Sequence, residues 1–277
     1  GYFVAWSYER KGAGAFLKGR FTRIGIPLLV FTLCVLGPIS YLLAGESRSF
    51  GEIITFLYGT GWQFPYAHLW FLMHLLLYSL GYGLWRQVVR RNSEHSELPV
   101  PNHLTSLLFV VALALITWIV RIWFPIDRWV PLFFVIPAEA AHLPQYVSLF
   151  AVGTLAYHGD WLRRLPTMTG LIWLAVGLVA AAAYYARDLG LVRLLPQVII
   201  STGGRGRGSL VFCAWEALVC TGLCVGLPVL FRMLLNRRYG KLFSAIVGAQ
   251  YAAYIFHLLV VIGIQAGLKP TDLAPLA

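Results

Sequence analysis

The chain has 277 residues, of which 59% are hydrophobic and only 12% are charged. Soluble globular domains are about 45–50% apolar and about 25% charged, so this composition excludes an ordinary soluble protein and predicts an all-α polytopic membrane protein. The net charge of +11 does not indicate nucleic-acid binding, because the basic residues cluster at the ends of apolar segments, where they contact lipid headgroups. We therefore expect the lipid bilayer, and no nucleic acid, as a partner.

The N-terminal region combines a short apolar stretch with a basic linker. Residues 1–8 (GYFVAWSY) are too few to cross a bilayer, so we interpret them as the end of a helix that starts further upstream. Residues 9–23 (ERKGAGAFLKGRFTR) follow as the basic linker. Because the chain begins without Met and stops without a polar tail, we expect residues 1–277 to be a single domain that is cut at both ends from a longer protein.

Seven apolar stretches follow the linker, and most are close to the roughly 20 residues that a membrane-spanning helix needs. They cover residues 24–44, 66–86, 104–124, 144–158, 168–187, 209–232 and 242–266. The predicted fold is therefore a bundle of about seven full transmembrane helices plus the N-terminal stub. The fourth stretch is the shortest, and a backward extension through residues 131–146 would be kinked or broken at Pro137 and Pro144.

The loops indicate an orientation but no bound metal or cofactor. Lys and Arg are more frequent in the first linker and in alternate loops, which predicts that the first linker is cytoplasmic. The sequence GGRGRG at 203–208 lacks the preceding strand and the spacing of a dinucleotide-binding fingerprint, so we interpret it as a flexible basic loop. The four cysteines show no Cys/His ligand spacing, and we predict no metal site.

Ionisable side chains inside the apolar stretches are the candidates for catalysis. Such a group costs about 2.5–3.5 kcal/mol at the centre of an inserted helix, so it usually faces the bundle interior or a water-filled cavity. On the predicted topology, His68, Glu216 and His257 share the outer half of the membrane, where an acid and an imidazole from neighbouring helices can meet. We take these three as candidate catalytic residues. His74 lies deeper and faces elsewhere, so we expect it to form an interhelical hydrogen bond.

Aromatic and basic residues near these positions are candidates for substrate binding. Tyr254 precedes His257 by three residues on one helical face, and Trp70 follows His68; aromatic faces suit sugar rings. Arg20 and Arg23 are three residues apart, and two guanidinium groups that point the same way suit a phosphate-rich ligand. The alternative for this arginine pair is an anchor that contacts lipid phosphates.

Four segments resemble the membrane acyltransferase-3 family. FLKGRFTRIGIPLLVF (16–31) resembles the family's R-x-x-R-(I/L)-x-x-P segment. HLWFLMHLLLY (68–78) and AQYAAYIFHLLVV (249–261) resemble the "HLWFL" and "Y-x-x-Y-x-x-H" helices of the branch that includes glucans biosynthesis protein C. LPQYVSLFAVGTLAYHGDWL (143–162) resembles that branch's glycine-containing helix, which ends in a charged turn.

This resemblance implies an integral membrane enzyme of a bacterial inner membrane, with a bundle of about ten helices. It implies transfer of an acyl group from cytoplasmic acyl-CoA, as co-substrate and with no bound cofactor, to a hydroxyl of a cell-envelope glycan or another acceptor. It also implies that Arg20 and Arg23 lie near the acyl-CoA phosphates, and that His68, Trp70 and His257 line the site. The family's expected general base is a first-helix histidine, ten residues after an Arg or Lys, and that motif is absent from these 277 residues.

Two other functions remain open from the residues alone. A transporter or flippase would use the buried Glu and His residues as a proton relay and the basic mouth as a lipid-phosphate site. The sequence shows neither an inverted repeat nor matching broken helices in two halves, which disfavours this interpretation. A non-catalytic membrane subunit would bind an assembly partner instead. Dependence on acyl-CoA separates the enzyme from the transporter.

Overall fold

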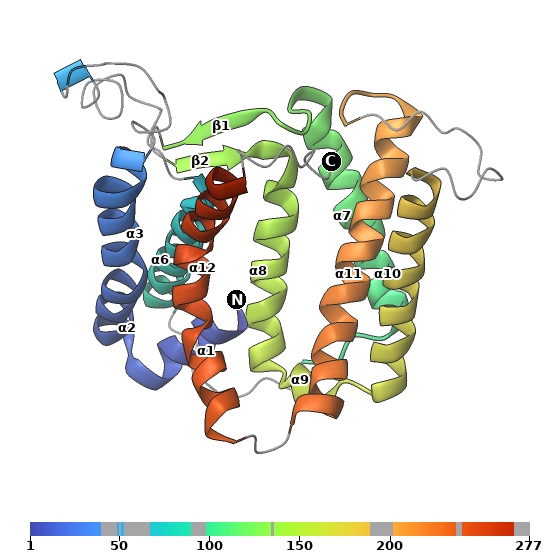
Figure 1. The fold of residues 1–277 in the computed structure, drawn as a ribbon. Helices are drawn as coiled ribbons and strands as arrows, with labels where there is room; N and C mark the ends of the chain where they lie inside the picture. The colour runs from blue at the N-terminus through green and yellow to red at the C-terminus, as the bar shows by residue number, and fades with distance from the viewer. Residues whose placement is uncertain are drawn as a thin grey trace. The chain divides into compact units, whose positions relative to one another are not determined.

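The computed structural model describes residues 1–39, 49, 51–52, 67–89, 98–133, 136–188, 202–236 and 240–268 (Figure 1). These residues form two compact units, which are described one at a time. The first unit comprises Gly1–Arg23 and His74–Asn236, and the second comprises Ile24–Met73 and Arg237–Ala277.

Helices make up nearly all of the first unit. Its elements are α1 (Tyr2–Lys11), α2 (Ala13–Arg20), the main part of α6 (Trp70–Val88), α7 (His103–Trp123), β1 (Trp129–Leu132), β2 (Ile136–Glu139), α8 (Leu143–His158), α9 (Trp161–Arg164), α10 (Thr167–Asp188) and α11 (Arg207–Leu235). The second unit contains α3 (Ile26–Phe31), the start of α6 and α12 (Lys241–Leu268).

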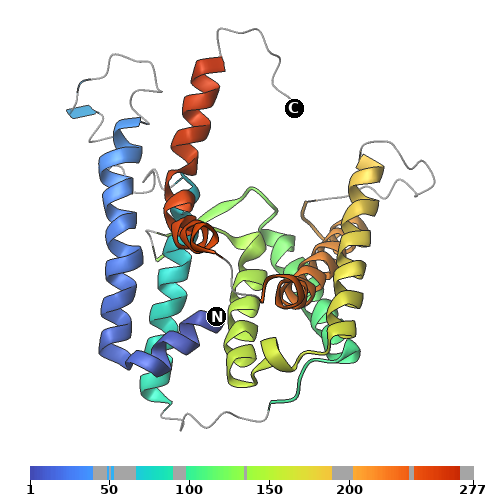
Figure 2. The same ribbon diagram turned by 60° about the horizontal axis from the view of Figure 1, so that its bottom comes forward.

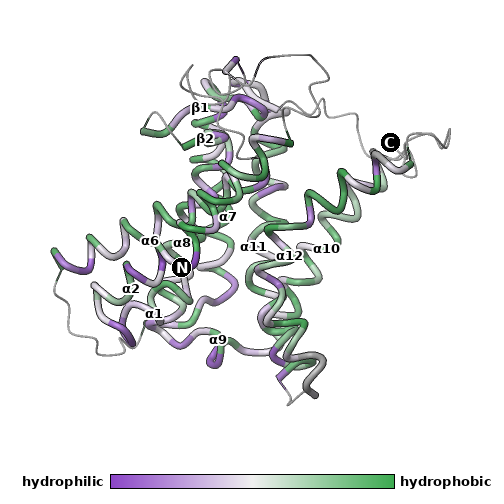
Figure 3. The backbone as a smooth tube through the Cα atoms, turned by 60° about the vertical axis from the view of Figure 1, so that its left-hand side comes forward, coloured by the Kyte–Doolittle hydropathy of each residue, from purple (hydrophilic) through white to green (hydrophobic). Residues whose placement is uncertain are grey.

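Five helices in the described part of the chain are long and apolar enough to span a membrane. They are Ala13–Ile39, His103–Trp123, Thr167–Ala186, Arg207–Leu235 and Ser244–Gln265. Hydrophobic residues predominate along them (Figure 3), which confirms the predicted all-α polytopic membrane protein. Two of the seven predicted stretches, 66–86 and 144–158, instead form α6 and α8, which have 19 and 16 residues and are not among the five.

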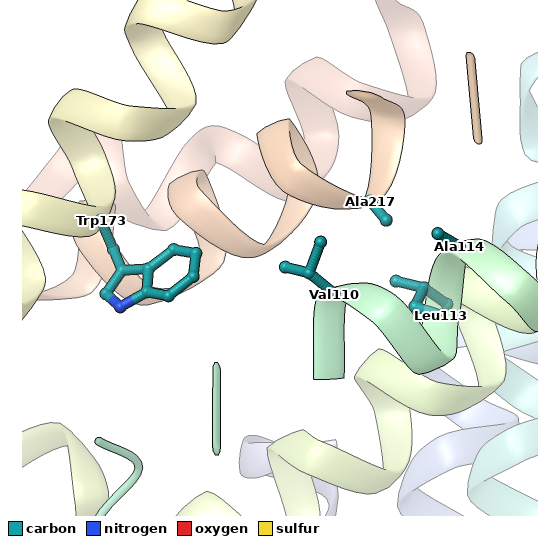
Figure 4. Close-up of a cluster of buried hydrophobic side chains, with 5 residues drawn as sticks. All are labelled: Val110, Leu113, Ala114, Trp173 and Ala217. Carbon is teal, nitrogen blue, oxygen red and sulfur yellow. The ribbon is translucent and has the colours of Figure 1, made fainter. Parts of the chain in front are cut away.

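The core of the first unit is built by α7, α10 and α11. Figures 1 and 2 show α10 and α11 side by side along their length. A Cβ added at Gly222 would lie 2.7 Å from the Cα of Gly177, so these two glycines let the backbones approach closely, as small residues do in membrane helix pairs. Figure 4 shows the apolar cluster where α7 meets this pair. Its buried side chains are Val110, Leu113, Ala114, Trp173 and Ala217.

A two-stranded antiparallel hairpin precedes α8, where the sequence allowed a backward extension of the helix kinked or broken by prolines. Strands β1 and β2 pair with Pro131 opposite Pro137, and neither proline has an N–H for a helical hydrogen bond. Helix α8 begins only at Leu143, with Pro144 in its first turn, where a missing N–H costs nothing. In the described residues, α8 therefore does not extend back past Leu143: Ile136–Glu139 form strand β2 and Ala140–His142 form a 3₁₀ turn, so the chain is interrupted at the prolines that the sequence marked as breakers.

The predicted basic linker is helical for most of its length. Helix α1 runs to Lys11, Gly12 turns the chain with a φ of 73°, and α2 begins at Ala13. A left-handed φ of this kind is readily adopted only by glycine. Helix α1 packs on α8, and a Cβ at Gly153 would lie 2.9 Å from the backbone nitrogen of Tyr2.

Hydrogen bonds attach neighbouring segments to the C-terminal end of α7 and to the C-terminal end of α11. At one end, the Gly204 N–H donates to the carbonyl of Arg121, so part of the predicted flexible basic loop is attached to the end of α7. At the other end, the guanidinium of Arg232, near the end of α11, donates to the carbonyls of Leu162, Arg163 and Leu165 and to the hydroxyl of Thr167. The segment around α9 is thereby bound to α11.

Candidate functional site

A buried salt bridge joins α7 to α11. Arg121 is completely buried, and its Nη2 lies 2.6 Å from Oε2 of Glu216. Its Nη1 also lies 3.5 Å from the sulfur of Cys213. A guanidinium inside a membrane protein needs a counter-charge, and Glu216, which the sequence predicted as a candidate catalytic residue, provides it.

His142 joins this ion pair to the hairpin. Its Nε2 lies 2.9 Å from Oε1 of Glu216, and its Nδ1 lies 2.9 Å from Oε2 of Glu139. A carboxylate offers only acceptors, so an imidazole between two carboxylates is best satisfied when both ring nitrogens carry protons. The hydrogen bond to Glu216 raises the pKa of His142, although burial acts in the opposite direction.

We call Arg121, Glu216, His142 and Glu139 the carboxylate–imidazole cluster. The second oxygen of Glu139 accepts a hydrogen bond from the backbone N–H of Asp127, which closes the turn between α7 and the hairpin. The side chains of Glu216, His142 and Glu139 remain 12–19% exposed, whereas Arg121 is fully covered. The cluster therefore links α7, α11, the hairpin and the start of α8. Its two carboxylates and its imidazole remain partly accessible to solvent.

Sequence reasoning expected Glu216 to meet an imidazole but did not single out Arg121 or His142. Arg121 is at the end of a predicted span, and His142 lies outside the apolar stretches that were searched for ionisable groups. The available signal was the three-residue spacing of Glu139 and His142 just before Pro144. In the described part of the chain, no group of three or more His, Cys, Asp or Glu side chains is arranged to hold a metal ion.

His74 is 1% exposed and is hydrogen-bonded to residues of the first unit. Its Nε2 lies 3.0 Å from the carbonyl of Pro137 and must donate, because a carbonyl only accepts. Its Nδ1 then accepts from the hydroxyl of Tyr78, also at 3.0 Å. His74 therefore links α6 to strand β2.

The second unit brings His68, Tyr254 and His257 together. The hydroxyl of Tyr254 donates to the carbonyl of His68 at 2.5 Å, and the rings of His68 and His257 lie 4.5 Å apart between centroids. These are three of the residues that the sequence singled out, and they come from the 3₁₀ turn Ala67–Leu69, directly before α6, and from α12. We call His68 and His257 the histidine pair.

Backbone carbonyls fix the tautomers of the histidine pair. His68 Nε2 donates to the carbonyl of Ile255 at 3.1 Å, and His257 Nδ1 donates to the carbonyl of Tyr254 at 2.7 Å. In the neutral rings, the lone pairs are then on Nδ1 of His68 and Nε2 of His257. His68 Nδ1 is buried and has no hydrogen-bond partner among the residues that the structure describes. An imidazole in this state can accept a proton.

The other predicted substrate-binding residues, Trp70, Arg20 and Arg23, are not part of the carboxylate–imidazole cluster or of the histidine pair. Trp70 is half-buried, and its ring contacts Phe71. Arg20 donates to the carbonyl of Phe3 at 3.3 Å and its guanidinium lies 5.1 Å from the ring centroid of Phe16. Arg23 is exposed in a π-helical turn that starts directly after Arg20. Turns of this type are rare and often occur at functional sites.

The comparisons with known proteins identify the family. A family model described as an acyltransferase domain, that of the acyltransferase-3 family, matches residues 1–277, which is the whole chain. The chain has no significant match among curated proteins or among solved structures. The match is to the family as a whole, so the branch suggested by the "HLWFL" helix stays a prediction. With its five apolar helices, the chain belongs to the acyltransferase-3 family of membrane acyltransferases.

Proposed function

We propose that the chain transfers an acyl group from acyl-CoA to a hydroxyl of a glycan or another acceptor of the cell envelope. We place it in a bacterial inner membrane with the region around Arg20 on the cytoplasmic side, where acyl-CoA is found. The observation that carries the proposal is the histidine pair, because O-acylation needs a group that takes the proton from the acceptor hydroxyl.

The histidine pair has the chemistry of a single general base. His68 has a lone pair on its buried Nδ1, and its ring is oriented by the Nε2 bond to the Ile255 carbonyl, while its backbone carbonyl accepts from Tyr254. Once one ring takes a proton, the neighbouring ring 4.5 Å away is disfavoured from taking another, because like charges repel. The pair therefore accepts one proton and can return it to the leaving thiolate of CoA. Trp70 and Tyr254 would contact the acceptor.

Arg20 and Arg23 would bind the phosphates of acyl-CoA. The bond to Phe3 and the stacking on Phe16 orient the Arg20 guanidinium while engaging few of its five donors. Arg23 is close enough for the two positive charges to repel each other, and a polyanionic ligand between them would remove that repulsion. In the first unit, Glu216 would orient the imidazole of His142.

Acyl transfer by the purified protein in proteoliposomes tests this function. Labelled acetyl-CoA and succinyl-CoA would be supplied with a membrane glycolipid extract as acceptor. Substituting His68→Phe should lower kcat by about 10²–10⁴-fold, the usual contribution of a general base. His103→Phe is the matched control, because His103 is exposed at the start of α7.

Three outcomes would count against this assignment. If another group is the base instead, His68→Phe would raise KM for the acceptor and spare kcat. A wild-type KM for acyl-CoA in the double variant Arg20→Ala/Arg23→Ala would remove the phosphate-binding role. Glycolipid movement across the bilayer without any acyl-CoA would favour the transporter.

A further inference from the structure

The guanidinium of Arg86, in the last turn of α6, is buried but makes no hydrogen bond to the part of the chain that the structure describes. The side chain is only 7% exposed, and its Nε is fully buried without a partner. A guanidinium carries five N–H donors, and buried polar groups are normally hydrogen-bonded. A basic side chain that only anchored the end of a membrane helix would instead extend to water. Arg86 therefore has donors for which the described protein provides no acceptor.

Two other arginines of the first unit show how the fold satisfies a guanidinium that has a structural role. Arg121 bonds to Glu216 and Cys213. Arg232 donates to three backbone carbonyls and one hydroxyl. Each of these two side chains thereby links two segments of the chain. The contrast indicates that the donors of Arg86 serve a ligand.

Glu9 of α1 approaches Arg86 but is not a full partner for it. The carboxylate Oε1 lies 3.7 Å from Nη2 of Arg86, which is too long for a hydrogen bond. The same oxygen lies closer, at 3.0 Å, to Nε2 of His158 at the end of α8. A proton between Nε2 and Oε1 makes this contact attractive, and Glu9 and His158 together then carry no net charge. The positive charge of Arg86 is left without full compensation.

A second unsatisfied donor lies next to Arg86 on α6. Tyr82 precedes Arg86 by four residues, so both lie on one helical face. Tyr82 is 6% exposed, and its hydroxyl is buried without a partner among the described residues. Both side chains also lie beside the ring of Tyr8, with the Tyr82 ring at 5.6 Å and the guanidinium at 5.9 Å from its centroid. We call Arg86 and Tyr82 the Arg86 site.

Aromatic rings connect the Arg86 site to Arg20. The ring of Tyr8 contacts Phe16 at 5.3 Å, and the guanidinium of Arg20 lies 5.1 Å from the ring centroid of Phe16. Tyr8, Phe16 and Tyr82 belong to one apolar cluster of the first unit. The Arg86 site and Arg20 therefore border the same cluster, beside the basic linker that the sequence predicts to be cytoplasmic.

We propose that Arg86 and Tyr82 bind a phosphate group of a ligand that approaches from the side of this linker. The planar guanidinium suits bidentate binding of two phosphate oxygens, and a further oxygen can accept from the hydroxyl of Tyr82. The bound anion compensates the buried charge of Arg86. Glu9 lowers the affinity in part, because like charges repel, and this gives a direct test of the charge balance.

Two ligands carry a phosphate group that can reach this side of the membrane. Coenzyme A has a 3′-phosphate in addition to its diphosphate, so Arg20 and Arg23 would bind the diphosphate while the Arg86 site binds the 3′-phosphate. This choice of ligand rests on the proposed function. A phospholipid headgroup such as that of phosphatidic acid is the other source. The phosphate chemistry is common to both, and the experiment separates them.

The test compares the binding of CoA and of dephospho-CoA, which lacks the 3′-phosphate, by calorimetry. The purified protein is held in nanodiscs of neutral phosphatidylcholine. The wild type should bind CoA about tenfold more tightly than dephospho-CoA, because hydrogen bonds to a charged group contribute at least this much. Arg86→Met should remove the difference. Arg163→Met is the matched control at an exposed arginine of α9 and should keep it.

Two further variants cover the case that Arg86→Met does not fold. Arg86→Lys keeps the charge but loses the planar fork, so the preference for CoA should fall between those of the wild type and of dephospho-CoA binding. Glu9→Gln removes the competing charge and should tighten the binding of CoA by about two- to fivefold. If Arg86 and Glu9 were only a structural ion pair, neither variant would change the affinity for CoA.

Nanodiscs that contain phosphatidic acid identify the lipid as the source. In that case, phosphatidic acid should raise the melting temperature of the wild type and not of the Arg86 variants, while CoA and dephospho-CoA bind alike. A wild type that responds to phosphatidic acid through Arg86 but binds no CoA would contradict the proposed acyl transfer and support the phosphate site. Equal responses of the wild type and the Arg86 variants to CoA, dephospho-CoA and phosphatidic acid would overturn the site itself.

Discussion

The guanidinium of Arg121 lies 2.6 Å from the carboxylate of Glu216, between two helices that otherwise meet through apolar side chains. Breaking a buried ion pair by removing one partner costs about 3–5 kcal/mol, because the other charge stays buried without compensation. Removing either Arg121 or Glu216 alone should therefore cost more stability than removing the two charges together.

Arg121→Met should destabilise the protein by about 3–5 kcal/mol, measured by thermal unfolding in detergent. The double variant Arg121→Met/Glu216→Gln should recover part of that loss, since no charge is left behind. Arg163→Met, at an exposed arginine of α9, serves as control and should change little. Equal losses in the single and double variants would show that the charge is not what matters at Glu216.

Raising the pH should loosen the carboxylate–imidazole cluster. The hydrogen bond to Glu216 raises the pKa of His142 above its ordinary value of about 6.5. The interaction of protonated His142 with Glu216 therefore stabilises the folded protein fully below about pH 6.5. This stabilisation is lost as the pH rises through the raised pKa of His142 in the folded protein. Melting temperatures between about pH 6 and pH 9 should fall for the wild type and for His103→Gln. His142→Gln should lose this slope, and an unchanged slope would exclude His142 as its source.

Gly222→Leu should separate α10 from α11. Its Cβ alone would lie 2.7 Å from the Cα of Gly177, and overpacking of this kind costs about 1–3 kcal/mol or more. Gly81→Ala is the control, because a Cβ at Gly81 meets nothing within 4 Å. Chemical denaturation in mixed micelles would compare the two, and a Gly222→Leu variant as stable as the wild type would refute the close packing.

Arg232→Lys should weaken the attachment of the α9 segment to α11. The guanidinium donates to Leu162, Arg163, Leu165 and Thr167 in a fixed fork, which a single ammonium cannot reproduce. We expect a loss of about 1–3 kcal/mol and faster proteolysis between α8 and α10. Arg207→Lys, at the exposed start of α11, should behave as the wild type. Identical cleavage rates for the two variants would contradict this role.

Composition and apolar run length predicted the membrane class and five of the spanning helices, because these depend only on local hydrophobicity. The hairpin was missed, since residues 131–146 are apolar enough for a helix and only the pairing of Pro131 with Pro137 shows otherwise. Sequence reasoning noted the prolines as breakers but had no signal for a strand partner.

The candidate sites were predicted in part for a similar reason. His68 and His257 stood out because an imidazole is costly in lipid, and the structure brings both into ring contact. The partners of Glu216 are 74 and 95 residues away in sequence, at His142 and Arg121, so no local spacing reveals them. In the sequence, Arg232 counted only as one of the basic loop residues that indicate the membrane orientation. Its four hydrogen-bond acceptors lie 65–70 residues away in sequence and come next to it only in the folded chain.

The two facing prolines of the hairpin have a consequence for how copies of the protein meet. The unpaired N–H and C=O groups of an open strand edge can pair with a strand of another molecule. Such intermolecular pairing is a risk for molecules that are crowded in the plane of a membrane. Pro131 and Pro137 remove the N–H donors from one rung of the ribbon, so a third strand cannot add there without leaving a carbonyl unmatched. The ribbon is thereby protected from growing into an intermolecular sheet.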